Sequence, residues 1–512
     1  MSPQTFAKKA SPLESMANFK QSALPTDETL HLLFVGGTWN TVSVVLIRFL
    51  PNLLIIFLAL FIEPSELGVY SYILASYTVL SLLADLGIAF ALQKFIQENL
   101  AETAQMATTA LALRLFSSVA LGAFCMAADH FWRALKGQGL YISLLLVSSA
   151  FGTAIFVLNA RLKYKKASLI TMARTVFWFV LAMILVSAGL HISGPIWAFI
   201  LSYVFFGVLT IFLEKSLFGK RFDWHFVRKI IRFGVPMTAA SAFNVLATQA
   251  GVLGIAYMMT ESEVGIYKLA TTFGMIPMLL GDALVLPLLP LVKKGMIDNA
   301  KETAELIRLL IRFLTVAGLF MLGAGIVLAK PLINLVFGTV YQNAVEPSRI
   351  LLGASFLGLL FTVLLSVLYM SDHLKIAAKI TGIVAVLSVG GNLALVPTRG
   401  ASGAAFSLLI AFGIGLSLVG VWLRRRLSVW LEWRKYGIYA LSMVEMGILL
   451  VLFVSFMRSQ VVSLLGGMIL APCLYILALI IQKGLTRAEI SHLLQIIKVK
   501  SKSRWMSGMG IR

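Results

Sequence analysis

The chain has 512 residues, of which 59% are hydrophobic and 13% are charged, and its mean hydropathy is +0.92. Soluble proteins contain roughly 45–50% apolar and about 25% charged residues, so this composition excludes a soluble globular protein, a disordered chain and a coiled coil. The 43 Lys and Arg residues outnumber the 22 Asp and Glu residues. Such an excess can indicate nucleic-acid binding, but cytoplasmic loops of membrane proteins also collect Lys and Arg. We therefore predict an integral membrane protein without a nucleic-acid partner.

The first thirty residues are polar and no apolar core of a signal peptide precedes Leu32, so we expect residues 1–35 to form a cytosolic tail. About fourteen apolar stretches follow, each with the roughly 20 residues that a spanning helix needs. Their predicted limits are 40–62, 67–90, 105–128, 139–160, 168–190, 194–213, 233–258, 265–290, 304–329, 349–370, 376–397, 400–423, 437–457 and 460–482. The expected fold is an all-α polytopic membrane protein.

Every second connecting loop is basic, which predicts that about 30 of the 43 cations and both termini lie in the cytosol. The expected location is the plasma membrane of a bacterium or archaeon. The longest loop, 214–232, has the pattern of an amphipathic helix with Trp224, Phe226 and Ile230 facing the bilayer. Residues expected in the cytosol are Lys163, Arg221, Lys294 and Arg425, and residues expected outside are Ser65, Ser262 and Arg399.

An internal repeat divides the chain. The segment SELGVY at 65–70 returns as SEVGIY at 262–267, an offset of 197 residues. At the same offset Asp85 matches Asp282, and Asn52 matches Gln249. We predict two six-helix lobes in the same orientation, related by a pseudo-two-fold axis along the membrane normal. The predicted parts are a tail (1–35), a first lobe (36–213), a linker (214–232), a second lobe (233–423), two extra helices (424–482) and a basic cytosolic tail (483–512).

No sequence feature indicates an enzyme. No loop is long enough to fold as a catalytic domain, and the chain has neither a phosphate-binding loop nor paired histidines at a metal-binding spacing. Cys125 and Cys473 lie in apolar stretches, where we expect small buried hydrophobic residues rather than a disulfide or metal ligands. We predict no cofactor and no metal.

Several segments resemble the polysaccharide transporter (Wzx-like) flippases of the multidrug/oligosaccharidyl-lipid/polysaccharide exporter superfamily. They are GGTWN (36–40), EPSELGVYSYILASYTVLSLLADLGIAFALQKFIQE (63–98), IIRFGVPM (230–237), SEVGIYKLA (262–270), FGTVYQNAVEPSRIL (337–351) and NLALVPTRGASGAAFS (392–407). The resemblance implies transport of undecaprenyl-pyrophosphate-linked oligosaccharide units from the inner to the outer leaflet. One departure concerns 245–254, which carries no charge, although the family often has an acidic residue there.

Ionisable residues within the predicted spans indicate where the substrate binds, because a charge at mid-bilayer is costly and faces a cavity or a partner. The candidates are Arg48, Asp85, Arg114, Arg174, Lys268, Asp282, Arg308, Arg312 and Glu445. This set has more cations than acids, as binding of a pyrophosphate requires. The expected substrate-binding residues are Arg48, Asn52, Arg114, Arg174, Lys268 and Arg312. Asp85 and Asp282 are the candidates for coupling or gating, and Arg48 is a candidate partner for Asp85.

Other functions stay open at this point. The alternatives are a flippase for the peptidoglycan lipid precursor, a cation or drug antiporter of the same superfamily, a membrane-embedded polymerase or ligase, and a structural scaffold. The cationic set disfavours a transporter of cationic drugs, for which an acidic cavity is expected. The expected partners are a lipid-linked oligosaccharide with its pyrophosphate, a coupling proton or sodium ion, and the polysaccharide polymerase and chain-length machinery.

Overall fold

The computed structural model describes residues 46–131, 137–219, 221–279, 281, 300–370, 373–427, 433–457 and 459–484. Within these ranges all regular secondary structure is helical, and eleven helices are long and apolar enough to cross a membrane. The predicted all-α polytopic membrane fold is therefore confirmed. The number of spans stays a prediction: the longest helical run, α15 (Leu374–Leu427), breaks at Gly400 (φ 51°, ψ −130°), and a shorter apolar helix covers Leu46–Phe61.

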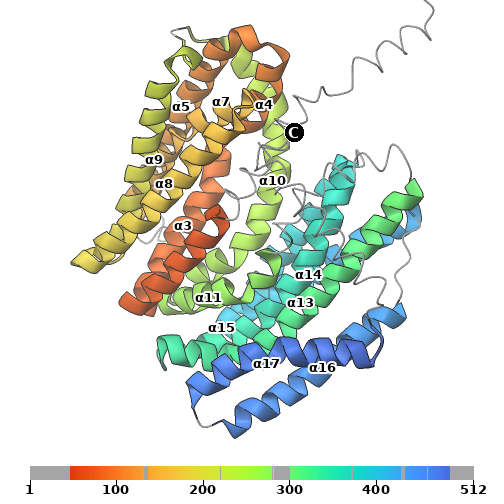
Figure 1. Cartoon of the computed structure of the whole chain (residues 1–512). Helices are drawn as coiled ribbons and strands as arrows, with labels where there is room; N and C mark the ends of the chain where they lie inside the picture. Colours follow the sequence, from red (N-terminus) through yellow and green to blue (C-terminus); the bar gives the residue numbers. More distant parts are fainter. Residues whose placement is uncertain are drawn as a thin grey trace, which may run out of the picture.

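The first bundle contains the N-terminal helices, drawn from red to yellow-green in Figure 1. They are Leu46–Phe61, α3 (Pro64–Asp85), α4 (Ile88–Glu98), α5 (Thr103–Phe131), α6 (Gly139–Ala150), α7 (Thr153–Ala160), α8 (Tyr164–Leu185) and α9 (Ser193–Leu213). Short helices lie at Leu100–Glu102, Val186–Leu190 and Lys215–Leu217. Pro64 starts α3, where the missing N–H costs nothing because the first turn has no intrahelical acceptor.

The second bundle follows along the chain, in green to blue (Figure 1). Its helices are α10 (Trp224–Met258), α11 (Glu261–Gly274), α13 (Ala300–Phe337), α14 (Val345–Met370) and both halves of α15, with a short helix at Gln342–Ala344. The helices α16 (Trp433–Phe456) and α17 (Gln460–Ile481) pack against α13 through buried residues that include Tyr439, Met446 and Tyr475. Figure 1 shows α16 and α17 at the periphery of the second bundle.

The two copies of the repeated segment touch each other where α3 and α11 begin. A Cβ atom at Gly68 would overlap the backbone carbonyl of Glu261, and a Cβ atom at Gly265 would overlap that of Pro64. Gly68 and Gly265 are 197 residues apart, as are Pro64 and Glu261. The contact is thus the same in both directions, as a two-fold axis between the helices requires. Glycine is needed at both positions because the backbones approach too closely for any side chain.

The repeated glutamate of the same segment also has a matching role in each bundle. Glu66 on α3 lies with its carboxylate 3.4 Å from Nδ1 of His191, in the turn before α9. Glu263 on α11 accepts a 3.4 Å hydrogen bond from the backbone N–H of Ala401, just after the break in α15. Each glutamate therefore fastens the repeated segment to a distant turn of its own bundle.

The segment 214–232 is expected to form an amphipathic helix with three apolar side chains facing the bilayer, and the structure agrees only in part. Trp224 is 78% exposed, but Phe226 and Ile230 are buried in a core with residues of α4 and α7. They face protein rather than the bilayer because the start of α10 is a continuous part of the following helix and lies against the first bundle. The preceding turn is fixed to α5 by hydrogen bonds from the N–H groups of Gly219 and Asp223 to two threonine hydroxyls, each 2.9 Å long.

Candidate functional site

The first component of the candidate site is the end of α3. Asp85 is the last residue of this helix, and the chain turns at Leu86 (φ 50°) and Gly87 (φ 78°) before α4 starts. The carbonyl groups at a helix C-terminus carry partial negative charge. A carboxylate placed there, within an apolar bundle, is stable only when a cation lies next to it.

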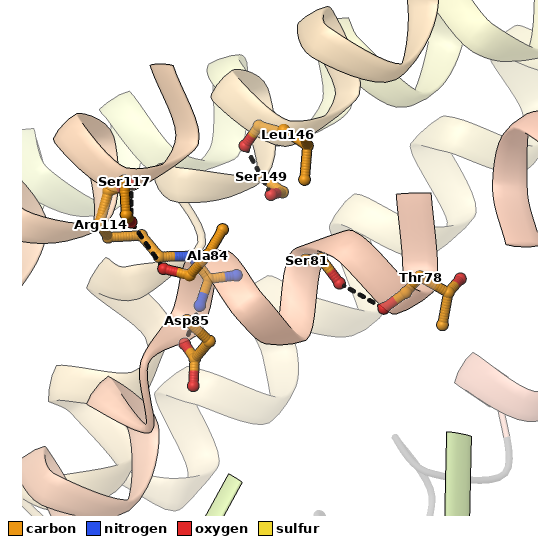
Figure 2. Close-up of polar contacts among 8 residues, drawn as sticks. All are labelled: Thr78, Ser81, Ala84, Asp85, Arg114, Ser117, Leu146 and Ser149. Carbon is orange, nitrogen blue, oxygen red and sulfur yellow. Dashed lines mark hydrogen bonds and ion pairs between the residues drawn. The ribbon is translucent and has the colours of Figure 1, made fainter. Parts of the chain in front are cut away.

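That cation is Arg114 on α5. Its Nη1 forms an ion pair with Oδ1 of Asp85, and Arg114 is only 7% exposed. The pair is held in register by Ser117, whose hydroxyl donates a 2.6 Å hydrogen bond to the carbonyl of Ala84 (Figure 2). The partner is therefore different from the expected Arg48, because residue depth does not show which helix lies beside the end of α3.

A cavity of about 240 Å³ adjoins this ion pair. Arg114 and Arg174 both line it, on α5 and α8, although 60 residues separate them in the chain. The polar lining is completed by side chains with hydroxyl or amide groups at six further positions: Tyr77, Ser149, Asn159, Ser168, Thr171 and Tyr203. Two arginines and several neutral polar residues thus line one cavity, and the carboxylate of Asp85 is paired with one of the arginines.

Arg174 is held in place by an aromatic ring. Its Cζ lies 4.0 Å from the centroid of the Tyr203 ring on α9, which is a cation–π contact. The ring stabilises the charge without neutralising it, so the guanidinium keeps its capacity to donate to an anion. Tyr203 and Tyr77 were not among the expected site residues. Tyr77 lies about two helical turns before Asp85 on α3. A search for charged residues misses Tyr77, but its spacing from Asp85 along the helix indicates that the two lie on a similar face.

The remaining candidates lie elsewhere. Arg48 is exposed on the first helix, where its carbonyl accepts a 2.8 Å hydrogen bond from Nδ2 of Asn52, and Ile47 beside it lines the cavity. Lys268 on α11 and Arg312 on α13 are partly buried in the other bundle and do not line this cavity. Asp282 lies outside the described residues.

The site has the chemistry of anion binding rather than of metal binding. In the described part of the chain, no three His, Cys, Asp or Glu side chains come together as metal ligands. Both cysteines are free thiols. Cys125 is buried as expected, but Cys473 is exposed, because it lies on the outward face of α17. Paired guanidinium groups in a low-dielectric cavity favour a phosphate-like group, which accepts several charge-assisted hydrogen bonds.

The arrangement of the helices is that of known membrane transporters. The structure matches the lipid II flippase MurJ in an inward closed conformation with a TM-score of 0.67, at 12% identity, over 87% of this chain and 98% of that one. It also matches an inward-facing multidrug resistance MATE family transporter of the MOP superfamily with a TM-score of 0.59, at 16% identity, over 75% and 98%. These likenesses show that the chain has the same fold as these two multi-helix membrane proteins.

Comparison of the sequence with known protein families assigns the chain to one of them. Residues 57–346, more than half of the chain, match the family model for polysaccharide biosynthesis proteins, and the chain belongs to that family. It is also 21% identical, over 456 residues, to a probable low-salt glycan biosynthesis flippase of Haloferax volcanii, covering 87% of this chain and 95% of that protein. The resemblance to Wzx-like polysaccharide transporters is confirmed.

Proposed function

We propose that this protein moves undecaprenyl-pyrophosphate-linked oligosaccharide units from the cytosolic to the outer leaflet of the plasma membrane, for the synthesis of a surface polysaccharide. The observation that carries the proposal is the cavity with Arg114 and Arg174 in its wall. A pyrophosphate carries at least two negative charges, and two arginines match it with several hydrogen bonds. Family membership and the glycan flippase relative support the same class of substrate.

In this proposal the pyrophosphate replaces Asp85 as the partner of Arg114. Asp85 balances the arginine while the cavity is empty, so that no isolated charge is buried. When the phosphate oxygens bind Arg114, the carboxylate loses its partner, and protonation then favours the loaded state. This exchange gives a route by which a proton gradient acts on transport, and Asp85 is the coupling group. Asp282, its match in the repeat, is proposed for the same role in the second lobe.

Transport by alternating access requires contacts that close one end of the molecule and then separate. The contact between Gly68 and Gly265 is proposed as the closure at the outer end, since Ser65 and Ser262 beside it are expected outside. It consists of backbone atoms without interlocking side chains, so the two helices can part without any side chain having to change rotamer.

The test is a flipping assay with the purified protein in liposomes. Lipid-linked oligosaccharide with a fluorescent sugar is placed in both leaflets, and the fraction that an external quencher reaches is followed over time. We expect the wild-type protein to move this lipid, and an Arg174→Ala variant to move it at least about tenfold more slowly, because a charge-assisted hydrogen bond contributes about 1.5–3 kcal/mol. The matched control is Arg228→Ala, an exposed arginine on α10.

Two outcomes would contradict the proposal. In the first, the protein moves lipid II as fast as, or faster than, an undecaprenyl-linked oligosaccharide, which would assign the peptidoglycan precursor instead. In the second, a proton gradient drives accumulation of a cationic dye while no lipid is moved, which would assign a drug antiporter.

A further inference from the structure

A second polar pocket lies in the C-terminal bundle, away from the cavity of Arg114. It has a volume of about 440 Å³, within the range of roughly 300–1,000 Å³ that small-molecule sites occupy. Four separate segments form it: the start of α11, the end of α13, the start of α14 and the break in α15. Its charged side chains are Glu263, Lys330, Glu346, Arg349 and Arg399. The pocket lies at the end of the molecule that the loop charges place outside.

Three of these charged groups are fixed without being neutralised. Arg349 donates from Nε to the carbonyl of Ile326 at 2.9 Å, which leaves its two terminal amino groups to bind another molecule. Arg399 lies with Cζ 5.6 Å from the ring centroid of Phe406. Glu263 accepts from the N–H of Ala401 at 3.4 Å.

Among the ion pairs of the described residues, none joins two of the five charged side chains of this pocket. The side chains of Lys330, Glu346 and Arg399 are exposed, so their charges are accessible to a ligand. Cations and carboxylates line the same pocket, and a ligand with both negative and hydrogen-bonding groups can contact both kinds.

We propose that this pocket binds an acidic sugar residue of the oligosaccharide, one that carries a carboxylate on its ring. The forked guanidinium groups of Arg349 and Arg399 match a sugar carboxylate. The sugar hydroxyls both donate and accept, and Gln342 and Asn343 supply side-chain amides that do the same. Three cations against two carboxylates leave one positive charge, which suits a ligand with one negative charge. Val345 and Pro347 supply an apolar floor for the ring.

This inference rests on the proposed function, because it assigns the glycan part of the same substrate to a site at the outer end. A free phosphate or a lipid phosphate would use the arginines but would have no use for the two glutamates. A neutral sugar would not need the excess of cations. The pocket therefore makes the protein selective for glycans with an acidic unit after they have crossed the membrane.

The experiment measures binding to the purified full-length protein in detergent by saturation-transfer difference NMR. The probes are glucuronic acid and glucose, with inorganic phosphate added as a competitor. We expect glucuronic acid to bind more tightly than glucose, and Arg399→Gln to weaken this binding about tenfold through loss of a charge-assisted contact. Arg349→Lys keeps the charge but loses the fork, and we expect an intermediate loss. Arg228→Gln, at an exposed position on α10, is the matched control and should bind as the wild type does.

Equal binding by the wild type and Arg399→Gln would overturn the inference, as would displacement of glucuronic acid by an equal concentration of phosphate. Flipping of the lipid-linked oligosaccharide without any binding of glucuronic acid would overturn this inference alone. Binding of glucuronic acid by a protein that flips no lipid would instead overturn the proposed function.

Discussion

The two bundles share a backbone contact but differ in where their charges lie. The helices α5 and α13 begin 197 residues apart, and Gly68 and Gly265 at the same offset make equivalent contacts. Yet the position that matches Arg114 is Ile311, which is 5% exposed. The first bundle thus has a cavity lined by Arg114 and Arg174, whereas the second has a pocket lined by charged residues of both signs. The repeat is retained where the two backbones meet, and the two copies differ at the position of Arg114.

The largest effect is expected when both members of the ion pair between Asp85 and Arg114 are replaced by neutral residues. The double variant Asp85→Asn/Arg114→Gln leaves no buried charge without a partner, so the protein should still fold. Flipping of lipid-linked oligosaccharide should fall at least about tenfold, because the pyrophosphate loses a charge-assisted contact. The matched control in the second bundle is Ile311→Val, which should cost about 0.5–1.5 kcal/mol of stability and leave flipping per folded molecule unchanged. Equal transport losses in the two variants would contradict the assignment of the cavity to one bundle.

The second expected effect is a loss of protein stability when only one member of the same ion pair is replaced. Asp85→Asn alone leaves Arg114 buried beside a neutral amide, and removing one partner of a buried pair costs about 3–5 kcal/mol. The melting temperature in detergent should fall clearly, and the second substitution Arg114→Gln should restore part of the loss. If Asp85→Asn melts at the wild-type temperature, the pair does not balance a buried charge.

The contact between Gly68 and Gly265 is symmetric, so replacing either glycine should have the same effect. A methyl group at either Gly68 or Gly265 meets a backbone carbonyl that no rotamer change can move, so the outer ends of α3 and α11 must separate. In Gly68→Ala and Gly265→Ala alike, a cysteine introduced at Ser65 should react faster with a membrane-impermeant reagent. Gly437→Ala on α16, where no atom lies near the new methyl group, is the control. A large effect from only one of the two variants would show that the contact is not symmetric.

The smallest effect is expected from an ion-pair cluster in which a buried glutamate is paired with two lysines that reach solvent. Glu214 accepts hydrogen bonds from Nζ of Lys163 at 2.7 Å and of Lys166 at 2.8 Å, and these contacts lower the pKa of its carboxyl. A lowered pKa stabilises the folded protein above the ordinary glutamate value of about 4.3, and this contribution is lost as the pH falls through the folded-state pKa. Glu214→Gln should therefore cost at most about 1 kcal/mol at pH 7.

That difference in melting temperature between the wild type and Glu214→Gln should become smaller as the pH is lowered from 7 to about 3.5, because the ordinary glutamate pKa is about 4.3. Glu305→Gln, at an exposed position on α13, should melt as the wild type does at both pH values. A difference that stays the same as the pH falls would mean that Glu214 contributes through packing rather than through its charge. The comparison with Asp85 separates an ion pair whose two members are both shielded from solvent from one whose cations reach solvent.

Much of this protein follows from its sequence alone. Apolar stretches of spanning length dictate helices, because backbone groups in a bilayer must form their hydrogen bonds within the segment. The repeat at an offset of 197 residues already paired Ser65–Tyr70 with Ser262–Tyr267, and the motifs around it placed the chain in its family. Arg114 and Arg174 are predicted as site residues because a charge inside a bilayer needs a partner or a cavity, and the structure places both in the wall of one cavity.

Only the tertiary structure decided which of these charges meet. Asp85 pairs with Arg114 on the neighbouring helix, Arg174 lies on the ring of Tyr203, and Phe226 turns toward protein instead of lipid. In a nearly all-apolar helix, sequence periodicity does not show which face points at which neighbour, because lipid and protein interior select the same side chains. The rotation of each helix, and with it the composition of the site, is set by packing between segments far apart in the chain.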